Sequence, residues 1–269
     1  MYYKNLVFDL YGTLVDIHTE EDDTVWEKTA LFYRFYGADY TGEQLHAACD
    51  ALVAAQKAQA GQAYECYPEV QIETVFTALF EAKGVQPAQP LGKQAAQLFR
   101  ILSIEYIQLY PYVLEALAAL RDEGRKLWLL TNAQRVFTEY EIRALGLEDA
   151  FDGIYISSDS GVSKPNVQFF RQLLDEQNLD PFTCLMIGND RSTDVAGARA
   201  AGMDALYLHT NLSPLADAPC NAEEYDPRFT KKRPMADYET GTSDWSEVYK
   251  TIQLADAWSA ATEPDRILP

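Results

Sequence analysis

The sequence Leu6-Val7-Phe8-Asp9-Leu10-Tyr11-Gly12-Thr13-Leu14 places an acidic residue directly after a short apolar run, with a glycine soon after it. A short continuous apolar run is typical of a strand buried in a parallel sheet. Glycine permits the tight turn that follows such a strand, and ligands of α/β folds bind beyond the carboxyl ends of the strands. We therefore predict a buried strand over Leu6–Phe8 and a functional role for Asp9 at the edge of the sheet.

Further apolar runs rich in β-branched or aromatic residues have the same character. They are Leu127–Leu130, Ile154–Ile156, Cys184–Ile187 and Ala205–Leu208. Segments with apolar residues at helical spacing alternate with these runs, as β-α-β units require. These segments are Tyr112–Asp122, Arg135–Ala144, Val167–Asn178 and Thr193–Ala201. The sequence therefore predicts an α/β fold with a doubly wound parallel sheet.

A long stretch between the first strand and Tyr112 has helical periodicity and little strand character. The helices expected there are Thr24–Tyr36, Gly42–Ala60, Gln71–Lys83 and Gln94–Leu109. We expect residues 1–16 and 110–208 to form the α/β core and residues 17–109 to form an inserted helical cap. Residues 209–269 are rich in Pro, Asp, Thr and Lys, which favours an irregular extension packed on the core, with a short helix over Asp244–Trp258.

Composition narrows the possible partners and the cellular location. A formal net charge of −19 disfavours binding to nucleic acid and to anionic membrane surfaces. No run of apolar residues is long enough to span a bilayer, and the amino terminus lacks the pattern of a signal peptide, so we expect a cytoplasmic protein. The cysteines have no metal-binding spacing and are expected to be free thiols; they are Cys49, Cys66, Cys184 and Cys220. The sequence leaves a homodimer possible.

Polar residues follow the predicted strands at the edge where Asp9 stands. Thr131 and Asn132 end the second strand, Lys164 follows the third, and Asp190 and Asp194 follow the fourth. Carboxylates gathered in one crevice repel each other, so a cluster of Asp9, Asp190 and Asp194 predicts a cation, and magnesium suits oxygen ligands. The Lys164 ammonium and the Thr131 hydroxyl can both donate to a phosphate or carboxylate oxygen of a substrate.

Together these four elements, in this order, resemble the haloacid dehalogenase superfamily of phosphotransferases, phosphatases and dehalogenases, over Lys4 to Leu208. The resemblance implies a Rossmann-like core and attack on the substrate by the Asp9 carboxylate, giving an aspartyl intermediate that water hydrolyses. The residues implied in catalysis are Asp9, Tyr11, Thr131 and Lys164, and those implied in substrate binding are Gly12, Thr131, Asn132 and Lys164. The implied ligands of Mg²⁺ are Asp9, the Tyr11 carbonyl, Asp190 and Asp194.

One residue departs from the pattern of the phosphatases, which carry a second aspartate two positions after the nucleophile. This chain has Tyr11 there, and a phenol with an ordinary pKa of about 10 is a poor general base at neutral pH. The Tyr-Gly-Thr-Leu sequence resembles the dehalogenase branch, which needs no metal. The dehalogenases also carry a cap arginine, for which Arg34 is a candidate, although a lone arginine on a helix is typical of a solvated face.

We favour a magnesium-dependent phosphatase, because dehalogenases replace the first acidic residue of the fourth element, whereas Asp190 and Asp194 are both present. The alternatives are a 2-haloacid dehalogenase and a non-catalytic binding protein with the same fold. Since the usual acid is missing, we expect a small-molecule phosphate with a good leaving group, such as an acyl or aryl phosphate.

Overall fold

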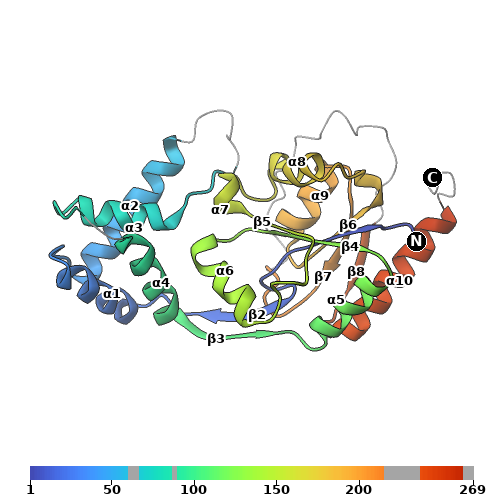
Figure 1. Ribbon diagram of the computed structural model, residues 1–269, viewed down its shortest axis with the longest axis horizontal. Coiled ribbons are helices and arrows are strands. Elements are labelled where there is room, and N and C mark those ends of the chain that lie inside the picture. Colours follow the sequence, from blue (N-terminus) through green and yellow to red (C-terminus); the bar gives the residue numbers. More distant parts are fainter. Residues whose placement is uncertain (60–66, 87–89, 215–236, 263–269) are drawn as a thin grey trace.

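The computed structural model describes residues 1–59, 67–86, 90–214 and 237–262 (Figure 1). Within these ranges six parallel strands form one sheet in the order β5-β4-β1-β6-β7-β8. The strands are β1 (Asn5–Phe8), β4 (Lys126–Thr131), β5 (Gly153–Ile156), β6 (Cys184–Gly188), β7 (Asp204–Leu208) and β8 (Asp237–Thr240). β1 lies between β4 and β6, with Phe8 in register with Leu129 and Ile187. The predicted α/β fold with a doubly wound parallel sheet is confirmed.

Helices cover both faces of this sheet, and each face has its own hydrophobic cluster (Figure 1). One face carries α5 (Val113–Asp122) and α10 (Trp245–Thr262), and the other carries α8 (Val167–Glu176) and α9 (Ala196–Ala200). Two further helices follow β4 and β5; they are α6 (Arg135–Ala144) and α7 (Ser157–Ser160). The central strands β4, β1, β6 and β7 are buried on both sides almost throughout, which explains the continuous apolar runs in their sequences.

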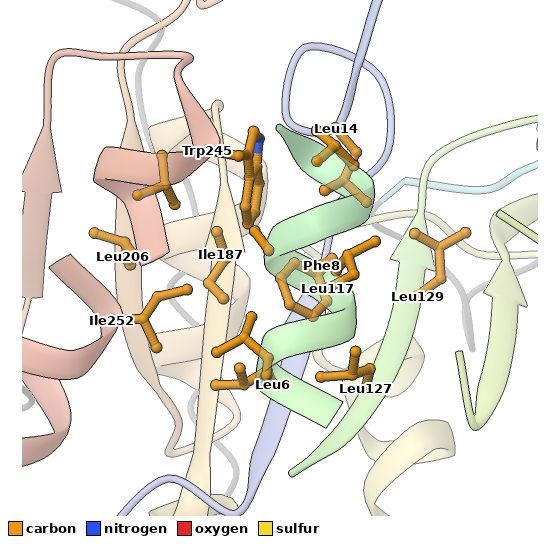
Figure 2. Packing of buried hydrophobic residues seen from close by; sticks show 14 of the residues in the cluster. Leu6, Phe8, Leu14, Leu117, Leu127, Leu129, Ile187, Leu206, Trp245 and Ile252 are labelled. Atoms are coloured by element: carbon orange, nitrogen blue, oxygen red, sulfur yellow. The ribbon is translucent and has the colours of Figure 1, made fainter. Parts of the chain in front are cut away.

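The carboxyl-terminal helix packs against the strand that carries Asp9. Figure 2 shows Trp245 of α10 beside Phe8 of β1, with Leu117 of α5 close by. The Trp245 side chain is fully buried, and its ring centroid lies 5.8 Å from that of Phe8. Its indole nitrogen donates a hydrogen bond of 3.0 Å to the carbonyl oxygen of Thr13. α10 therefore packs against the end of β1 and supports the loop that follows it.

Four helices form a second unit with a separate hydrophobic cluster, which we call the helical unit. They are α1 (Asp23–Phe35), α2 (Gly42–Gln59), α3 (Ile72–Glu81) and α4 (Leu91–Ser103). Figure 1 shows the helical unit on one side of the α/β core, joined to it through β2 (Val15–Thr19) and β3 (Ile104–Leu109). β2 and β3 pair as an antiparallel two-stranded sheet.

The structure corrects the sequence prediction in three places. The helix predicted over Gln94–Leu109 ends at Ser103, because Ile104–Leu109 pairs with β2 instead. β2 also crosses the predicted boundary between core and insert at residues 16 and 17. The predicted irregular extension contains β8, which adds a strand beside β7, whereas the helix predicted over Asp244–Trp258 is present as α10 and covers one face of the sheet.

The structure bears on two expectations from composition. Cys49 and Cys184 are buried free thiols, whereas Cys66 and Cys220 lie outside the described residues. Among the described helices, none combines the length and the apolar character that a membrane span requires.

Candidate active site

Asp9 stands at the carboxyl edge of the sheet, directly after β1. Its backbone N–H donates to the carbonyl oxygen of Ile187 in β6 at 3.0 Å, so the parallel pairing extends to this residue. The side chain is almost completely buried. Thr131 ends the neighbouring strand β4, and Gly188 ends β6 on the other side. The topology therefore brings the ends of three central strands together around Asp9, as the sequence predicts.

The ammonium group of Lys164 is the centre of the site. Its Nζ atom donates to Asp9 Oδ1 and Asp194 Oδ1, each at 2.7 Å, and to the Leu130 carbonyl oxygen at 2.8 Å. Asn132 holds the Lys164 backbone, accepting from its N–H at 2.8 Å and donating to its carbonyl at 3.0 Å. Burial alone would lower the pKa of the ammonium, but the charges of Asp194 and Asp9 raise it, so Lys164 stays cationic.

Asp194 supplies the second carboxylate of this group from a π-helical turn, Arg191–Val195, that precedes α9. Its Oδ2 atom accepts a hydrogen bond of 3.0 Å from the backbone N–H of Asp190. Burial, opposed by the charge of Lys164, raises the pKa of the Asp194 carboxyl to about 7. Two buried carboxylates thus share one ammonium group, which leaves an excess of negative charge at the site.

Two hydroxyl groups and an amide complete the surroundings of Asp9. Thr13 Oγ1 donates to Asp9 Oδ2 at 3.2 Å and lies 3.3 Å from Asn189 Oδ1. The hydroxyl of Thr131 is buried and has no hydrogen-bond partner in the described part of the chain. Such a hydroxyl is costly unless a ligand bonds to it. Sequence reasoning missed Thr13 and Asn189, although each lies close after its strand, as Asp9 does.

Contrary to the prediction, the Asp190 carboxylate does not join those of Asp9 and Asp194. Its Oδ1 atom accepts from the backbone N–H of Ser192 at 2.7 Å and from the Ser192 hydroxyl at 2.6 Å, which caps the turn that carries Asp194. Among the described residues, the group of three side chains with metal-ligand spacing is His18, Glu20 and Glu105, all exposed on or beside β2 and β3. The structure therefore brings Asp9 and Asp194 together at Lys164, as predicted, but the Asp190 carboxylate does not join them, and Asn189 instead lies beside Thr13 and Gly12.

The donor atoms near Asp9 are nevertheless of the kind that magnesium prefers. Carboxylate, amide and backbone carbonyl oxygens are all hard ligands, and the Asp9 carboxylate is close to the amide oxygen of Asn189 through their shared partner Thr13. Both carboxylate oxygens of Asp194 already accept hydrogen bonds. The residues therefore suit a Mg²⁺ ion bound mainly by Asp9 and neutral oxygens.

The side chain of Tyr11 is directed to α6. Its hydroxyl donates a short hydrogen bond to Glu141 Oε2 and lies 3.0 Å from Thr138 Oγ1. Burial, followed by the negative charge of Glu141, raises the pKa of this hydroxyl far above its ordinary value. Tyr11 is thus a neutral phenol whose O–H group already donates a hydrogen bond to a carboxylate.

Arg34, a candidate from the sequence, and His18 do not contact Asp9. Arg34 Nη1 donates to the Tyr40 carbonyl at 2.6 Å, and Nη2 pairs with Glu27 at 2.9 Å, both within the helical unit. His18 is exposed and lies 3.6 Å from Glu105 across β2 and β3. Arg34 therefore does not fill the place of a cap arginine beside the core.

Gly12 has a backbone φ of +80°, and a Cβ atom built there would lie 2.2 Å from Asn189 Nδ2. Gly12→Ala is therefore expected to push Asn189 off Thr13, and through Thr13 to disturb Asp9. Gly124→Ala is the matched control, because Gly124 has a φ of +84° and no atom within 4 Å of the built Cβ. Both changes carry the same backbone strain.

The contact with Asn189 should lower the free energy of unfolding of Gly12→Ala by about 1–3 kcal/mol more than Gly124→Ala. Chemical denaturation of the two variants measures this difference. Turnover should also fall, by about 10- to 100-fold, in Gly12→Ala alone, because small displacements at a reacting centre are costly. Equal turnover in both variants would contradict the placement of Asn189 beside the reacting atoms.

Comparisons with known proteins identify the family of the chain. Residues 3–202 match the family described as haloacid dehalogenase-like hydrolase. The chain is 27% identical over 203 residues to an N-acylneuraminate-9-phosphatase from Rattus norvegicus, covering 75% of this chain and 80% of that protein. It is 30% identical over 169 residues to a phosphoserine phosphatase from Thermus thermophilus, covering 63% of this chain and 67% of that protein.

A solved structure is similar over nearly the whole chain. It is a 2-haloacid dehalogenase from Pseudomonas syringae pv. Tomato, with a TM-score of 0.59 and 21% sequence identity, covering 94% of this chain and 99% of that one. At this identity the likeness supports the fold alone. The fold is thus shared over nearly the whole length of both chains.

Proposed function

The chain belongs to the family of haloacid dehalogenase-like hydrolases, and on this basis we propose that it is a magnesium-dependent phosphatase acting on a small phosphorylated molecule. Its relatives of known activity are phosphatases by name, which supports phosphate over halide chemistry. We also propose a cytoplasmic location, in agreement with the free thiols of Cys49 and Cys184.

The observation that carries the proposal is the arrangement of Asp9, Lys164 and Thr131. A carboxylate whose oxygen lies 2.7 Å from a buried ammonium is fixed in direction, as a nucleophile requires. The same ammonium and the unpartnered Thr131 hydroxyl are donors suited to phosphoryl oxygens. Asn132 acts indirectly, because its side chain fixes the backbone of Lys164.

In the proposed reaction the Asp9 carboxylate attacks phosphorus, and the bond between phosphorus and the leaving oxygen breaks with its electron pair on that oxygen. The product is an aspartyl phosphate on Asp9. Water then attacks the phosphorus of this intermediate, releasing inorganic phosphate and the free carboxylate. A magnesium ion held by Asp9, the Tyr11 carbonyl and Asn189, with Asp194 nearby, would neutralise charge on the phosphoryl oxygens.

Leaving-group protonation is the step for which this chain lacks the usual residue. The Tyr11 hydroxyl donates a hydrogen bond to Glu141 and has a raised pKa, so it cannot readily protonate a departing alkoxide. We therefore propose that the substrates are acyl or aryl phosphates, whose leaving oxygens need little protonation.

A second candidate function, release of halide from a 2-haloacid, is favoured by one observation. The neutral Asn189, and not Asp190, lies beside Thr13 near the nucleophile, and a neutral residue in the fourth element resembles the dehalogenases. Halide departs without a proton, so Tyr11 would be no handicap to that reaction. The two functions differ in their need for metal.

The deciding experiment measures turnover of acetyl phosphate, p-nitrophenyl phosphate, an alkyl phosphate and 2-chloropropionate, each with magnesium and with a chelator. We expect phosphate release that is lost on chelation and restored by Mg²⁺. The acyl and aryl phosphates should react about 100-fold faster than the alkyl ester, because general acid catalysis contributes about 10²- to 10⁴-fold where it is present. Metal-independent release of chloride would instead establish the dehalogenase, and equal rates for all esters would contradict the leaving-group preference.

A further inference from the structure

The carboxylate of Glu141 in α6 joins three separate segments of the chain. Arg100 of α4 donates to it through Nε at 2.6 Å and through Nη2 at 3.2 Å. Tyr11, from the loop that carries Asp9, donates its hydroxyl to Oε2 of the same carboxylate. Glu141 is only 5% exposed. Buried hydrogen bonds to an ionised group are among the stronger contacts in a protein.

Arg100 is the arginine of the helical unit that reaches the core. Its guanidinium carbon lies 5.7 Å from the centroid of the Tyr11 ring and 5.4 Å from that of Phe137. Contacts of this kind between a cation and aromatic faces add to the ion pair with Glu141. Tyr11 lies in the loop after β1 and Phe137 lies in α6, so Arg100 connects the helical unit to both of these segments.

Arg100 lies near the junction between the helical unit and the core. α4 ends at Ser103 and continues directly into β3, one of the two strands that join the helical unit to the core. A change in the angle between the helical unit and the core must therefore move Arg100 relative to Glu141. Val136 of α6, which is buried in the hydrophobic cluster of the helical unit, lies at the same contact between helices.

We propose that Glu141 is a positioning residue that couples the placement of the helical unit to the placement of the loop carrying Asp9. The proposal rests on the proposed function only in taking Asp9 as the nucleophile. When Arg100 and Tyr11 both bond Glu141, α4 lies against α6 and the loop after Asp9 is held by the same carboxylate. The site is then covered and aligned in a single arrangement.

Tyr11→Phe provides the sharpest test. Phenylalanine keeps the ring that faces Arg100 and removes only the hydroxyl that bonds Glu141. The hydroxyl also lies 3.0 Å from Thr138 Oγ1, so an effect on α4 is assigned to Glu141 when Tyr11→Phe adds nothing to Glu141→Gln. Tyr155→Phe is the matched control, because the Tyr155 hydroxyl also donates to a glutamate, Glu176 Oε2 at 3.0 Å, with both residues in the core.

Two measurements are needed, and the first does not depend on activity. Hydrogen–deuterium exchange should show about 10-fold faster exchange of α4 amides in Tyr11→Phe, because local opening is governed by such contacts. Tyr155→Phe should leave α4 unchanged. Unchanged exchange of α4 in Tyr11→Phe would overturn the coupling, whether or not the protein proves to be a phosphatase.

The second measurement is a double-mutant cycle on turnover, with Tyr11→Phe, Arg100→Met and their combination. We expect each single change to lower kcat by about 10-fold with little change in KM, because alignment and not binding is lost. The combination should lower kcat by no more than either change alone, since both act through Glu141. If the kcat losses of Tyr11→Phe and Arg100→Met multiply in the combined variant, both in the wild-type background and in the Glu141→Gln background, the two residues act separately. That result would overturn the proposal.

Discussion

Asp9→Asn is expected to abolish turnover while leaving the protein at least as stable as the wild type. The amide has nearly the same shape but is not a nucleophile, so kcat should fall by at least about 10⁴-fold. Stability should be kept because Lys164 then faces a single carboxylate, Asp194, in place of two. One buried ammonium paired with one buried carboxylate is better balanced than one shared by two.

Turnover and urea unfolding of the purified variant measure both parts of this prediction. Asp190→Asn is the matched control, because Asp190 lies near the same edge of the sheet but its carboxylate bonds Ser192. Its turnover should remain within about 10-fold of wild type, as loss of a turn cap costs mainly stability. A loss in Asp190→Asn as severe as in Asp9→Asn would mean that Asp190 reaches the reacting atoms after all.

Lys164→Met should destabilise the fold more than any other single change in the site. The Lys164 side chain is 1% exposed, and its ammonium is the shared partner of two carboxylates. Removing one member of a buried ionic group leaves charges without compensation, which costs about 3–5 kcal/mol. Chemical denaturation measures the free energy of unfolding, and the slope of this free energy against denaturant concentration should be compared between the variants.

Lys126→Met is the control for this second prediction. Lys126 also pairs with an aspartate at 2.7 Å, but its side chain is 61% exposed, so its loss should cost no more than about 1 kcal/mol. Adding Asp194→Asn to Lys164→Met should recover part of the lost stability, because it removes one of the unpaired carboxylates. Equal losses in the two lysine variants would refute the electrostatic role of Lys164.

Sequence patterns predicted the sheet and the centre of the site because both depend on local features. Continuous apolar runs mark the buried strands, and the residues directly after them stand at the edge where Asp9 meets Lys164. Parallel pairing then follows from the alternation of strands and helices. The order of these elements along the chain was enough to bring Asp9, Lys164 and Asp194 together.

The failures concern features that no local pattern determines. Ile104–Leu109 has apolar residues compatible with a helix, and its strand conformation depends on β2, which lies far away in the sequence. The choice between Asn189 and Asp190 depends on how the chain turns after Gly188, since a shift by one residue reverses the direction of a side chain. Arg100 differs from Arg34 only in its tertiary neighbours, so a sequence alone could not identify it as the arginine beside the core.

The contact between Trp245 and the carbonyl of Thr13 has a consequence for biosynthesis. The amino end of a chain leaves the ribosome first, so β1 and Asp9 emerge long before Trp245 is translated. Until then Phe8 lacks the ring that covers it, and the loop lacks its support from behind. A nascent chain can begin to form the sheet, but the loop after Asp9 gains this support only once α10 has been made and has docked.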